Sequence, residues 1–509
     1  MFLPMEILRS YDISPQLYYG GTSRNTSTEV FINTNCFGVY NSLDIIETQF
    51  SSLPNDILID ILSRLPVKPL MQFKSVCKRW FSLIKHDSHL IDLHFARSKS
   101  RPILLYIDPL QEKGVLHTSL IASFERSKTL QQRISCAEIV EASNGEEEEV
   151  EALVSQVRIT NDQWFLYNQV LEPVNGLVCF IDWVTYAIRL YNASTREATP
   201  WIKSTLLAEE NYKLESKSTM EIKTHCSPIY KFGFDPEKKE HKIFCFWRLV
   251  ARQQRHRYNS AERPDYERWE ALTVGRDTKW RRINAVPNEY NQVKIKDVLP
   301  PAFSNKRPVY ADGTIYWSNK EYYSDRLGNT NPNDPDVIVA FDVASEKYRV
   351  IPIPNFILDE PRDEDYRLPI GMLVLGGHLT LLYRMESHVV KLWMLDDTAN
   401  KKLENCRGNK SNWSTETITL PFFCDNRVGG FGISESTDKI VFESCGRRNS
   451  INFVSLYSYD RKEKTCKKIE IDGLPSFTHH SERSLVTTFT ESLFPVQPFN
   501  KKTPSLDFM

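Results

Sequence analysis

The segment between Pro54 and Pro66 constrains the fold more than any other part of this chain, because it is patterned as one short amphipathic helix. Pro54 suits a first helical turn, where its missing N–H costs nothing, and Asp56 places negative charge near the positive end of the helix dipole. Pro66 ends the helix. Between the prolines, apolar residues recur at spacings of one, three and four and form one stripe: Ile57, Leu58, Ile61, Leu62 and Leu65.

Short helices are also predicted directly behind this one, from about residue 68 to 73 and from about 76 to 84, and a further amphipathic helix from 89 to 96. A unit of about 45 residues is near the lower limit for a domain that folds alone, so it completes its core by oligomerising or docking. The apolar face of the first helix is therefore a candidate interface.

These residues resemble the F-box, the module that ties substrate receptors to the Skp-type adaptor of cullin-based ubiquitin ligases. The family pattern of Leu-Pro, paired aliphatic residues, Leu-Pro and then Val-Cys-[Lys/Arg]-x-Trp is met without a gap from Leu53 to Trp80. Some of its residues must also serve the core of the module, and the sequence does not divide the two groups. The alternative is a helical hairpin that belongs to a larger core. The resemblance implies these adaptor-facing residues: Leu53, Pro54, Ile57, Leu58, Ile61, Leu65, Pro66, Leu70, Val76, Cys77 and Trp80.

Composition limits the possible partners. The chain has 509 residues, enough for two or three domains, and its formal net charge of -1 gives no electrostatic case for nucleic acid. The basic run 252–257 lies beside acidic residues and is interpreted as a solvated loop. No apolar run approaches the roughly 18 residues that span a bilayer, and the first residues lack the pattern of a signal peptide. We therefore expect no nucleic-acid or membrane partner, and a location in the cytoplasm, the nucleus or both.

Residues with catalytic or metal-binding spacing are not found. The ten cysteines lie far apart, without Cys-x-x-Cys or a Cys/His group at zinc spacing, so reduced thiols are expected and no disulfide framework or metal site is indicated. The segment Gly432-Ile433-Ser434-Glu435-Ser436 lacks the final glycine of a nucleophile elbow. The pair His479-His480 is interpreted as a loop feature. We therefore predict no catalytic residue, no cofactor and no bound metal.

The region from 103 to 495 consists of short alternating apolar segments separated by Gly, Asn, Asp and Pro. Units of about 40 to 80 residues, each with about four strands, favour a β-propeller over a sandwich, and an irregular β fold remains the alternative. We expect about six blades, within a range of five to seven. The sixth combines segments 103–107, 154–159 and 484–489 and closes the ring by joining the two ends. The other five begin at these turns: Asn175-Gly176, Phe232-Gly233-Phe234-Asp235, Asp312-Gly313, Gly376-Gly377 and Asp438-Lys439.

This region resembles the F-box-associated domain of the large plant F-box family, which includes the S-locus receptors. The family marks Asn-Gly-Leu-Val-Cys and Phe-Gly-Phe-Asp stand here at 175–179 and 232–235. Tyr191-Asn192-Ala193 stands where the family has Trp-Asn-Pro, and Lys279-Trp280-Arg281 replaces Ser-Trp-Arg. Together the two resemblances cover about 53 to 490 and imply a multidomain protein, α then all-β, with a helical F-box followed by a kelch-like β-propeller.

The expected domains are a poorly structured extension at 1–50, the F-box at 51–97, the propeller-like domain at 103–495 and a flexible tail at 496–509. The combined resemblance implies a substrate-recognition subunit of a Skp-cullin-F-box ubiquitin ligase that is itself non-catalytic. Its partners would be a Skp-type adaptor, through it cullin and RING subunits, and an unidentified target protein. Two competing hypotheses remain: a propeller scaffold without a link to ubiquitin transfer, and a propeller enzyme.

Overall fold

The computed structural model has a helical part and a larger β part, and the predicted extension at 1–50 lies outside the residues it describes. So do the basic run 252–257 and the pair at 479–480. The predicted tail from 496 also lies outside, except for Val496, which is buried. The described residues are 53–101, 103–109, 132–138, 157–159, 167, 169–182, 185–204, 225–250, 266–277, 279–284, 308–318, 336–360, 371–386, 388–396, 413–421, 429–432, 439–448, 451–469 and 485–496.

The first described elements are helices, and their ends follow from local sequence. One helix begins after Pro54 and the next after Pro66. The third is capped by the thiol of Cys77, which accepts a hydrogen bond from the Trp80 N–H at 3.5 Å, and the fourth by Asp87, whose carboxylate accepts from the Leu90 N–H at 2.8 Å. We call these helices the helical module: α3 (Asn55–Leu62), α4 (Val67–Phe73), α5 (Lys78–His86) and α6 (Ser88–Ser98). In the described part of the chain, no helix has the length and apolar character needed to cross a membrane.

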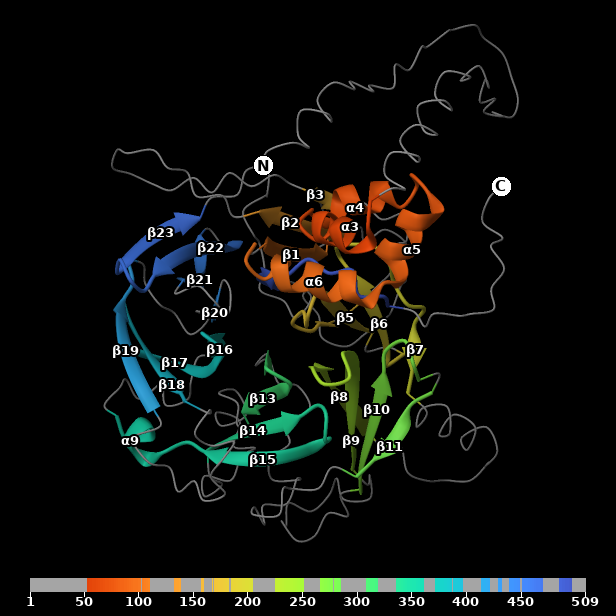
Figure 1. The fold of residues 1–509 in the computed structure, drawn as a ribbon. Helices are drawn as coiled ribbons and strands as arrows, with labels where there is room; N and C mark the ends of the chain where they lie inside the picture. Colours follow the sequence, from red (N-terminus) through yellow and green to blue (C-terminus); the bar gives the residue numbers. More distant parts are fainter. Residues whose placement is uncertain are drawn as a thin grey trace, which may run out of the picture. The chain divides into compact units, whose positions relative to one another are not determined.

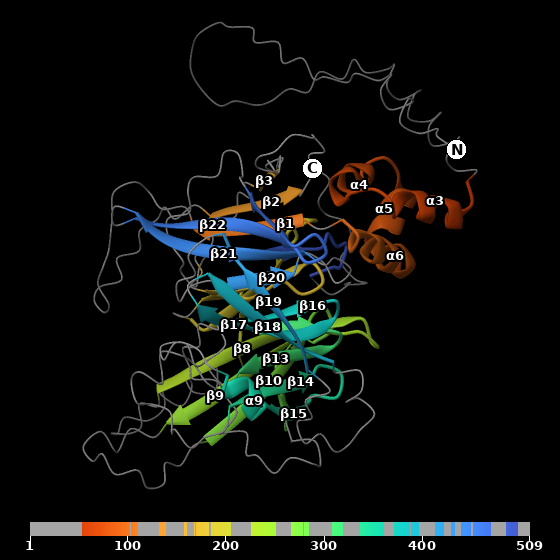
Figure 2. The same ribbon diagram turned by 90° about the vertical axis from the view of Figure 1, so that its left-hand side faces the viewer.

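The β part consists of six four-stranded antiparallel sheets in the described residues (Figures 1 and 2). Their strands are β1 (Ile103–Pro109), β2 (Gln132–Glu138), β3 (Val157–Ile159), β4 (Gln169–Val170), β5 (Leu177–Asp182), β6 (Ala187–Asn192), β7 (Ile202–Lys203), β8 (His225–Asp235), β9 (Glu240–Val250), β10 (Tyr266–Thr273), β11 (Arg281–Ile283), β12 (Val309–Ala311), β13 (Thr314–Ser318), β14 (Val337–Asp342), β15 (Lys347–Pro352), β16 (Gly371–Leu375), β17 (His378–Glu386), β18 (Val389–Leu395), β19 (Trp413–Thr419), β20 (Gly429–Gly432), β21 (Lys439–Arg448), β22 (Ile451–Asp460), β23 (Thr465–Ile469) and β24 (Leu485–Phe489). A short helix, α9 (Asn355–Leu358), follows β15.

The first sheet joins the two ends of the β part, as the sequence predicts. Its order is β24-β1-β2-β3, and Leu105 of β1 pairs with Thr487 of β24. Strand β2 was not anticipated and completes the sheet. We call this sheet blade 1, and the following ones blade 2 (β4–β7), blade 3 (β8–β11), blade 4 (β12–β15), blade 5 (β16–β19) and blade 6 (β20–β23).

Each blade packs on the next through apolar side chains. Phe180 of blade 2 lies in one cluster with Leu105 of blade 1, Phe244 of blade 3 in one with Phe341 of blade 4, and Leu392 of blade 5 in one with Phe442 of blade 6. Other clusters join blade 2 to blade 3 and blade 4 to blade 5, and β20 contacts β24. The six blades therefore form a complete cycle, and the expected class of helices followed by a β-propeller is confirmed.

The aromatic side chains that stand on strands fill these blade interfaces. In the described β part six tryptophans are buried, all on strands except Trp280, which directly precedes β11: Trp247, Trp269, Trp280, Trp317, Trp393 and Trp413. The Asn-Gly and Asp-Gly pairs form the tight turns that their positive φ angles require, 46° and 82° at Asn175 and Gly176, and 41° and 80° at Asp312 and Gly313.

Candidate functional site

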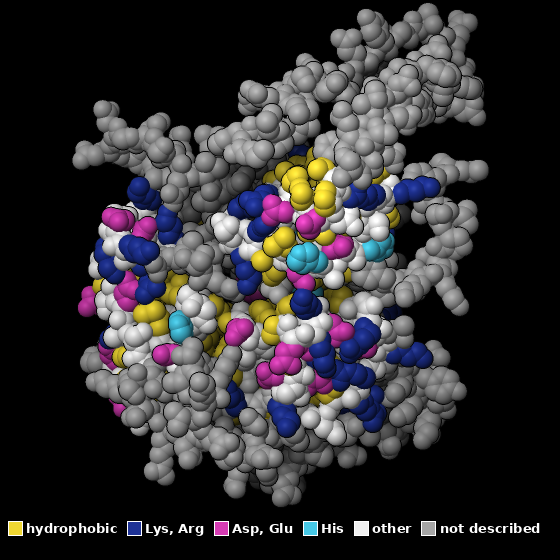
Figure 3. All heavy atoms as spheres, in the orientation of Figure 1, with side chains coloured by type: hydrophobic (Ala, Val, Ile, Leu, Met, Phe, Trp, Pro, Cys, Tyr) yellow, Lys and Arg dark blue, Asp and Glu magenta, His cyan; other side chains and the backbone are white. Residues whose placement is uncertain are grey.

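The helical module carries an exposed apolar face. Ile57 and Ile61 of α3 are 46% and 39% exposed, and Phe81 of α5 is 40% exposed. The two isoleucines are four residues apart and lie on one side of the helix. Figure 3 shows hydrophobic side chains at the surface of the module. We call these three residues the apolar face.

The structure divides the eleven residues predicted to face an adaptor. Leu58, Leu70 and Trp80 are buried, at 1%, 0% and 9% exposure. They pack with Leu62 and Ile84 inside the module. The other eight reach the surface; Pro54, Ile57, Ile61 and Pro66 are exposed, and Leu53, Leu65, Val76 and Cys77 are half-buried. The buried three therefore form the core, and the eight remain candidates for contact with a partner.

Phe81 was missed in the prediction. It follows Trp80 directly, and in a helix adjacent residues point in different directions, so the side chain after a buried tryptophan turns outward. The ammonium groups of Lys85 and Lys74 lie 5.3 and 6.0 Å from the centre of its ring. An exposed aromatic ring with a cationic border is suited to a protein surface that carries carboxylates.

Charged groups hold the first helix against the fourth. Arg97 of α6 donates a hydrogen bond to the Asp60 carbonyl at 2.7 Å and pairs with the Asp60 carboxylate at 2.5 Å. Hydrogen bonds from Arg64 and Arg97 lower the pKa of Asp60. His94 of α6 contacts the Leu65 carbonyl through Nε2 at 3.0 Å, and burial lowers the pKa of this histidine to about 4. These contacts hold α3 in place against α6, so the orientation of its exposed side is fixed.

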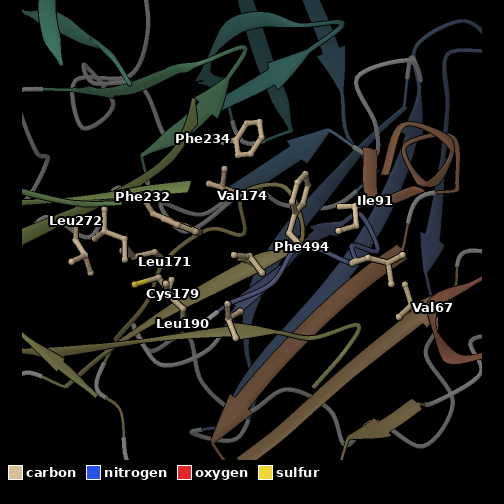
Figure 4. Close-up of a cluster of buried hydrophobic side chains, with 14 of the residues drawn as sticks. Val67, Ile91, Leu171, Val174, Cys179, Leu190, Phe232, Phe234, Leu272 and Phe494 are labelled. Atoms are coloured by element: carbon tan, nitrogen blue, oxygen red, sulfur yellow. The ribbon is translucent and has the colours of Figure 1, made fainter. Parts of the chain in front are cut away.

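Behind the apolar face, the module packs on blades 2 and 3 in a contact that we call the junction. Figure 4 shows Phe494, which follows β24, between Ile91 of α6 and the side chains of Val174 and Phe234. The rings of Phe494 and Phe95 meet edge to face with centroids 5.3 Å apart. The Val67 N–H donates to the Glu491 carboxylate at 3.3 Å. Module and blades therefore share one apolar cluster.

Catalytic chemistry finds little support in these residues. Among the described positions, no group of three or more His, Cys, Asp or Glu side chains could hold a metal ion. Burial raises the pKa of the Cys179 and Cys245 thiols, which keeps them protonated and unreactive.

Comparison with known proteins gives two family matches. Residues 119–493 match the F-box associated beta propeller domain, and residues 50–92 match the F-box domain. The Arabidopsis thaliana F-box protein At5g65850 is 23% identical over 436 residues, which cover 84% of this chain and 86% of that protein. F-box protein At4g19940 of the same plant is 24% identical over 440 residues, covering 83% and 86%. Among solved structures, a chain of a nidogen/laminin complex is 10% identical and covers 77% of this chain and 99% of its own length, with a TM-score of 0.30, too low to support an inference.

Proposed function

The chain belongs to the family of F-box proteins with an F-box associated beta propeller domain, and from this membership we propose that it is the substrate-recognition subunit of a Skp-cullin-F-box ubiquitin ligase. The helical module binds a Skp-type adaptor and, through it, cullin and RING subunits. The propeller holds a target protein. The chain makes no bond itself and acts by proximity, bringing a target lysine within reach of the ubiquitin carrier. The proposal includes a location in the cytoplasm, the nucleus or both, and no nucleic-acid or membrane partner.

The exposed apolar face is the observation that carries this proposal. The module completes its own core with Leu58, Leu62 and Trp80, so Ile57 and Ile61 are not needed for it. Full burial of such a side chain contributes about 1.5–3 kcal/mol. Because association itself costs several kcal/mol, the half-buried neighbours Leu53, Leu65 and Val76 must add to the contact.

Co-expression with a plant Skp-type adaptor, followed by co-purification and gel filtration, tests the proposal. We expect the full chain to form a stoichiometric complex and the double variant Ile57→Lys with Ile61→Lys to form none. A point variant is a better control than deletion of the module, because deletion would expose Phe494 and the apolar cluster around it. The absence of a complex with the unmodified chain, or an equal complex with the variant, would overturn the proposal.

The junction favours one competing function, in which the module only covers the end of the propeller in a scaffold protein. Its contacts with Phe494 and Glu491 would serve that purpose equally well. The same experiment separates the two, because a scaffold has no reason to bind the adaptor through Ile57 and Ile61.

A further inference from the structure

We infer that the segment Glu491–Val496 clamps the helical module onto the propeller, and that Asn192 and Gly176 are positioning residues that hold this segment in place. We call residues 491–496 the clamp. The purpose assigned to it, which is to fix the orientation of the bound adaptor relative to the propeller, rests on the proposed function. The clamping itself does not.

The clamp contacts the module through a half-buried carboxylate and a buried ring. Glu491 accepts a hydrogen bond from the first backbone N–H of α4, at Val67. The Phe494 ring packs on Phe95 of α6 on one side, and on Phe234 and His241 of blade 3 on the other, with centroids 5.5 and 5.4 Å away. One side chain thus touches both the module and a blade (Figure 4).

Asn192, at the end of β6, holds the clamp from blade 2. Its side chain is buried, and its Nδ2 donates to the carbonyls of Ser492 at 3.0 Å and Phe494 at 2.9 Å. Its Oδ1 accepts from the backbone N–H groups of Ser194 and Thr195 at 2.9 and 3.1 Å. The Ser194 hydroxyl in turn accepts from the Ser492 N–H at 3.1 Å. Both N–H groups of the amide therefore bond to the clamp, and its oxygen accepts two bonds from its own turn.

Gly176 lets the clamp approach closely. A Cβ atom at this position would lie 2.1 Å from the Ser492 Cβ and 2.9 Å from the Thr490 carbonyl oxygen. The backbone of the Asn175-Gly176 turn is thus in direct contact with the chain just before and within the clamp. This gives a physical role to two family marks, the Asn-Gly turn and the asparagine of the 191–193 turn.

In the described residues, two partly exposed ion pairs also cross the junction. Lys239 of the β8–β9 turn pairs with Asp92 of α6, and Lys74 of α4 lies 3.9 Å from Glu197. Exposed pairs contribute little to stability. The clamp, with its buried ring and the buried amide that holds it, therefore contributes more to fixing the module than these ion pairs do, and it does so as part of the shared apolar cluster.

A fixed module matters because transfer by proximity depends on distance and direction. If the bound adaptor projects from the propeller in one fixed direction, only the lysines that face the ubiquitin carrier are within reach. Loosening the clamp widens the reachable set without touching the adaptor surface or the target surface.

Hydrogen exchange on the full chain alone tests the clamp. Asn192→Ala is expected to speed exchange in α6 and in residues 491–496 by about tenfold or more. Asp460→Ala is the matched control, because Asp460 also ends a strand, β22, and accepts from two backbone N–H groups of its own turn, but it lies in blade 6. It should change exchange only around its turn. Unchanged exchange in α6 of Asn192→Ala would overturn the inference.

Phe494→Ala provides a second variant should Asn192→Ala fail to fold. It removes the ring that bridges α6 and blade 3 and keeps the side-chain hydrogen bonds of Asn192, since all four join the amide to backbone groups. Faster exchange in α6 with unchanged exchange in blades 4 and 5 supports the clamp, and protection of α6 equal to that of the unmodified chain contradicts it.

The consequence for transfer is tested in the reconstituted ligase by mapping which of the receptor's own lysines receive ubiquitin. The Asn192→Ala variant should bind the adaptor as tightly as the unmodified chain does. It should receive ubiquitin on a wider set of its own lysines. An identical set in both proteins would overturn the positioning role. If the unmodified chain binds no adaptor, the proposed function fails, while hydrogen exchange still decides the clamp.

Discussion

Lys242 Nζ lies 3.1 Å from Asp235 Oδ2, with the two side chains 2% and 0% exposed. The same ammonium group lies 3.4 Å from Glu346 Oε1 and donates to the Val343 carbonyl at 2.9 Å, which joins blade 3 to blade 4. Burial alone would raise the pKa of Asp235, but hydrogen bonds from the Lys238 N–H and from Lys242 outweigh it, so this pKa lies below its usual value. The Asp235 carboxylate is therefore ionised in the folded protein at neutral pH.

Removing one partner of this pair should destabilise the fold strongly. We expect Lys242→Met to lower the free energy of unfolding by about 3–5 kcal/mol, because Asp235 is left as an uncompensated buried charge. Chemical denaturation measures the change. The control is Lys439→Met, whose ion pair with Asp460 at 3.9 Å is partly exposed, and which should cost less than about 1 kcal/mol. Equal effects of the two substitutions would contradict the assignment.

Two adjacent residues of α3 should behave oppositely. Ile57→Ala should weaken adaptor binding and leave the melting temperature nearly unchanged, because Ile57 is 46% exposed. Leu58→Ala should lower the free energy of unfolding by about 2–5 kcal/mol, because it leaves a cavity in the core. Calorimetry of binding and thermal denaturation separate the two effects. A stable Leu58→Ala protein would show that Leu58 is not a core residue.

Glycine substitution should report how closely the clamp is packed. Gly176 and Gly377 have nearly equal φ angles, 82° and 81°, but a Cβ at Gly377 would meet nothing within 4 Å. Gly377→Ala should therefore cost only the backbone strain, about 1–2 kcal/mol. Gly176→Ala should cost clearly more, since it also displaces Ser492. Thermal denaturation of both variants gives the comparison, and equal losses would argue against a close contact.

Stability should fall as the pH drops below the usual histidine range. Burial lowers the pKa of both His94 and His241 from 6.5 to about 4. Between these pH values the unfolded chain binds more protons than the folded one. The contribution of the two neutral histidines to stability is therefore fully present above pH 6.5 and is lost as the pH falls towards 4. Each histidine should lower the free energy of unfolding by about 3 kcal/mol as the pH falls through this window.

Urea denaturation across this pH window measures the loss. His241→Gln should remove roughly half of the histidine-dependent loss, because His94 and His241 are the two buried imidazoles with a lowered pKa among the described residues. An undiminished dependence in that variant would mean that other groups cause the acid loss.

Local patterns account for most of the elements. The prolines at 54 and 66 bound α3, and the turns at 175–176 and 312–313 come where the sequence places glycine after Asn or Asp. Even the ring closure was predicted, because segments 103–107 and 484–489 lacked partners of their own within the repeats. The helix ends and the turns depend on neighbours along the chain, which a single sequence contains, whereas the ring closure followed from the number of repeats.

What the sequence alone determined is the type and order of the elements: an apolar helix stripe with more surface than its module can cover, followed by repeated four-stranded units. Only the tertiary structure decided which side of that stripe is covered. Leu58 is buried and Ile57 is exposed because α5 and α6 pack against one side of α3. It also decided that Asn192 meets Ser492 and Phe494, some 300 positions away. That contact exists only once the ring has closed, and no local preference of residue 192 encodes it.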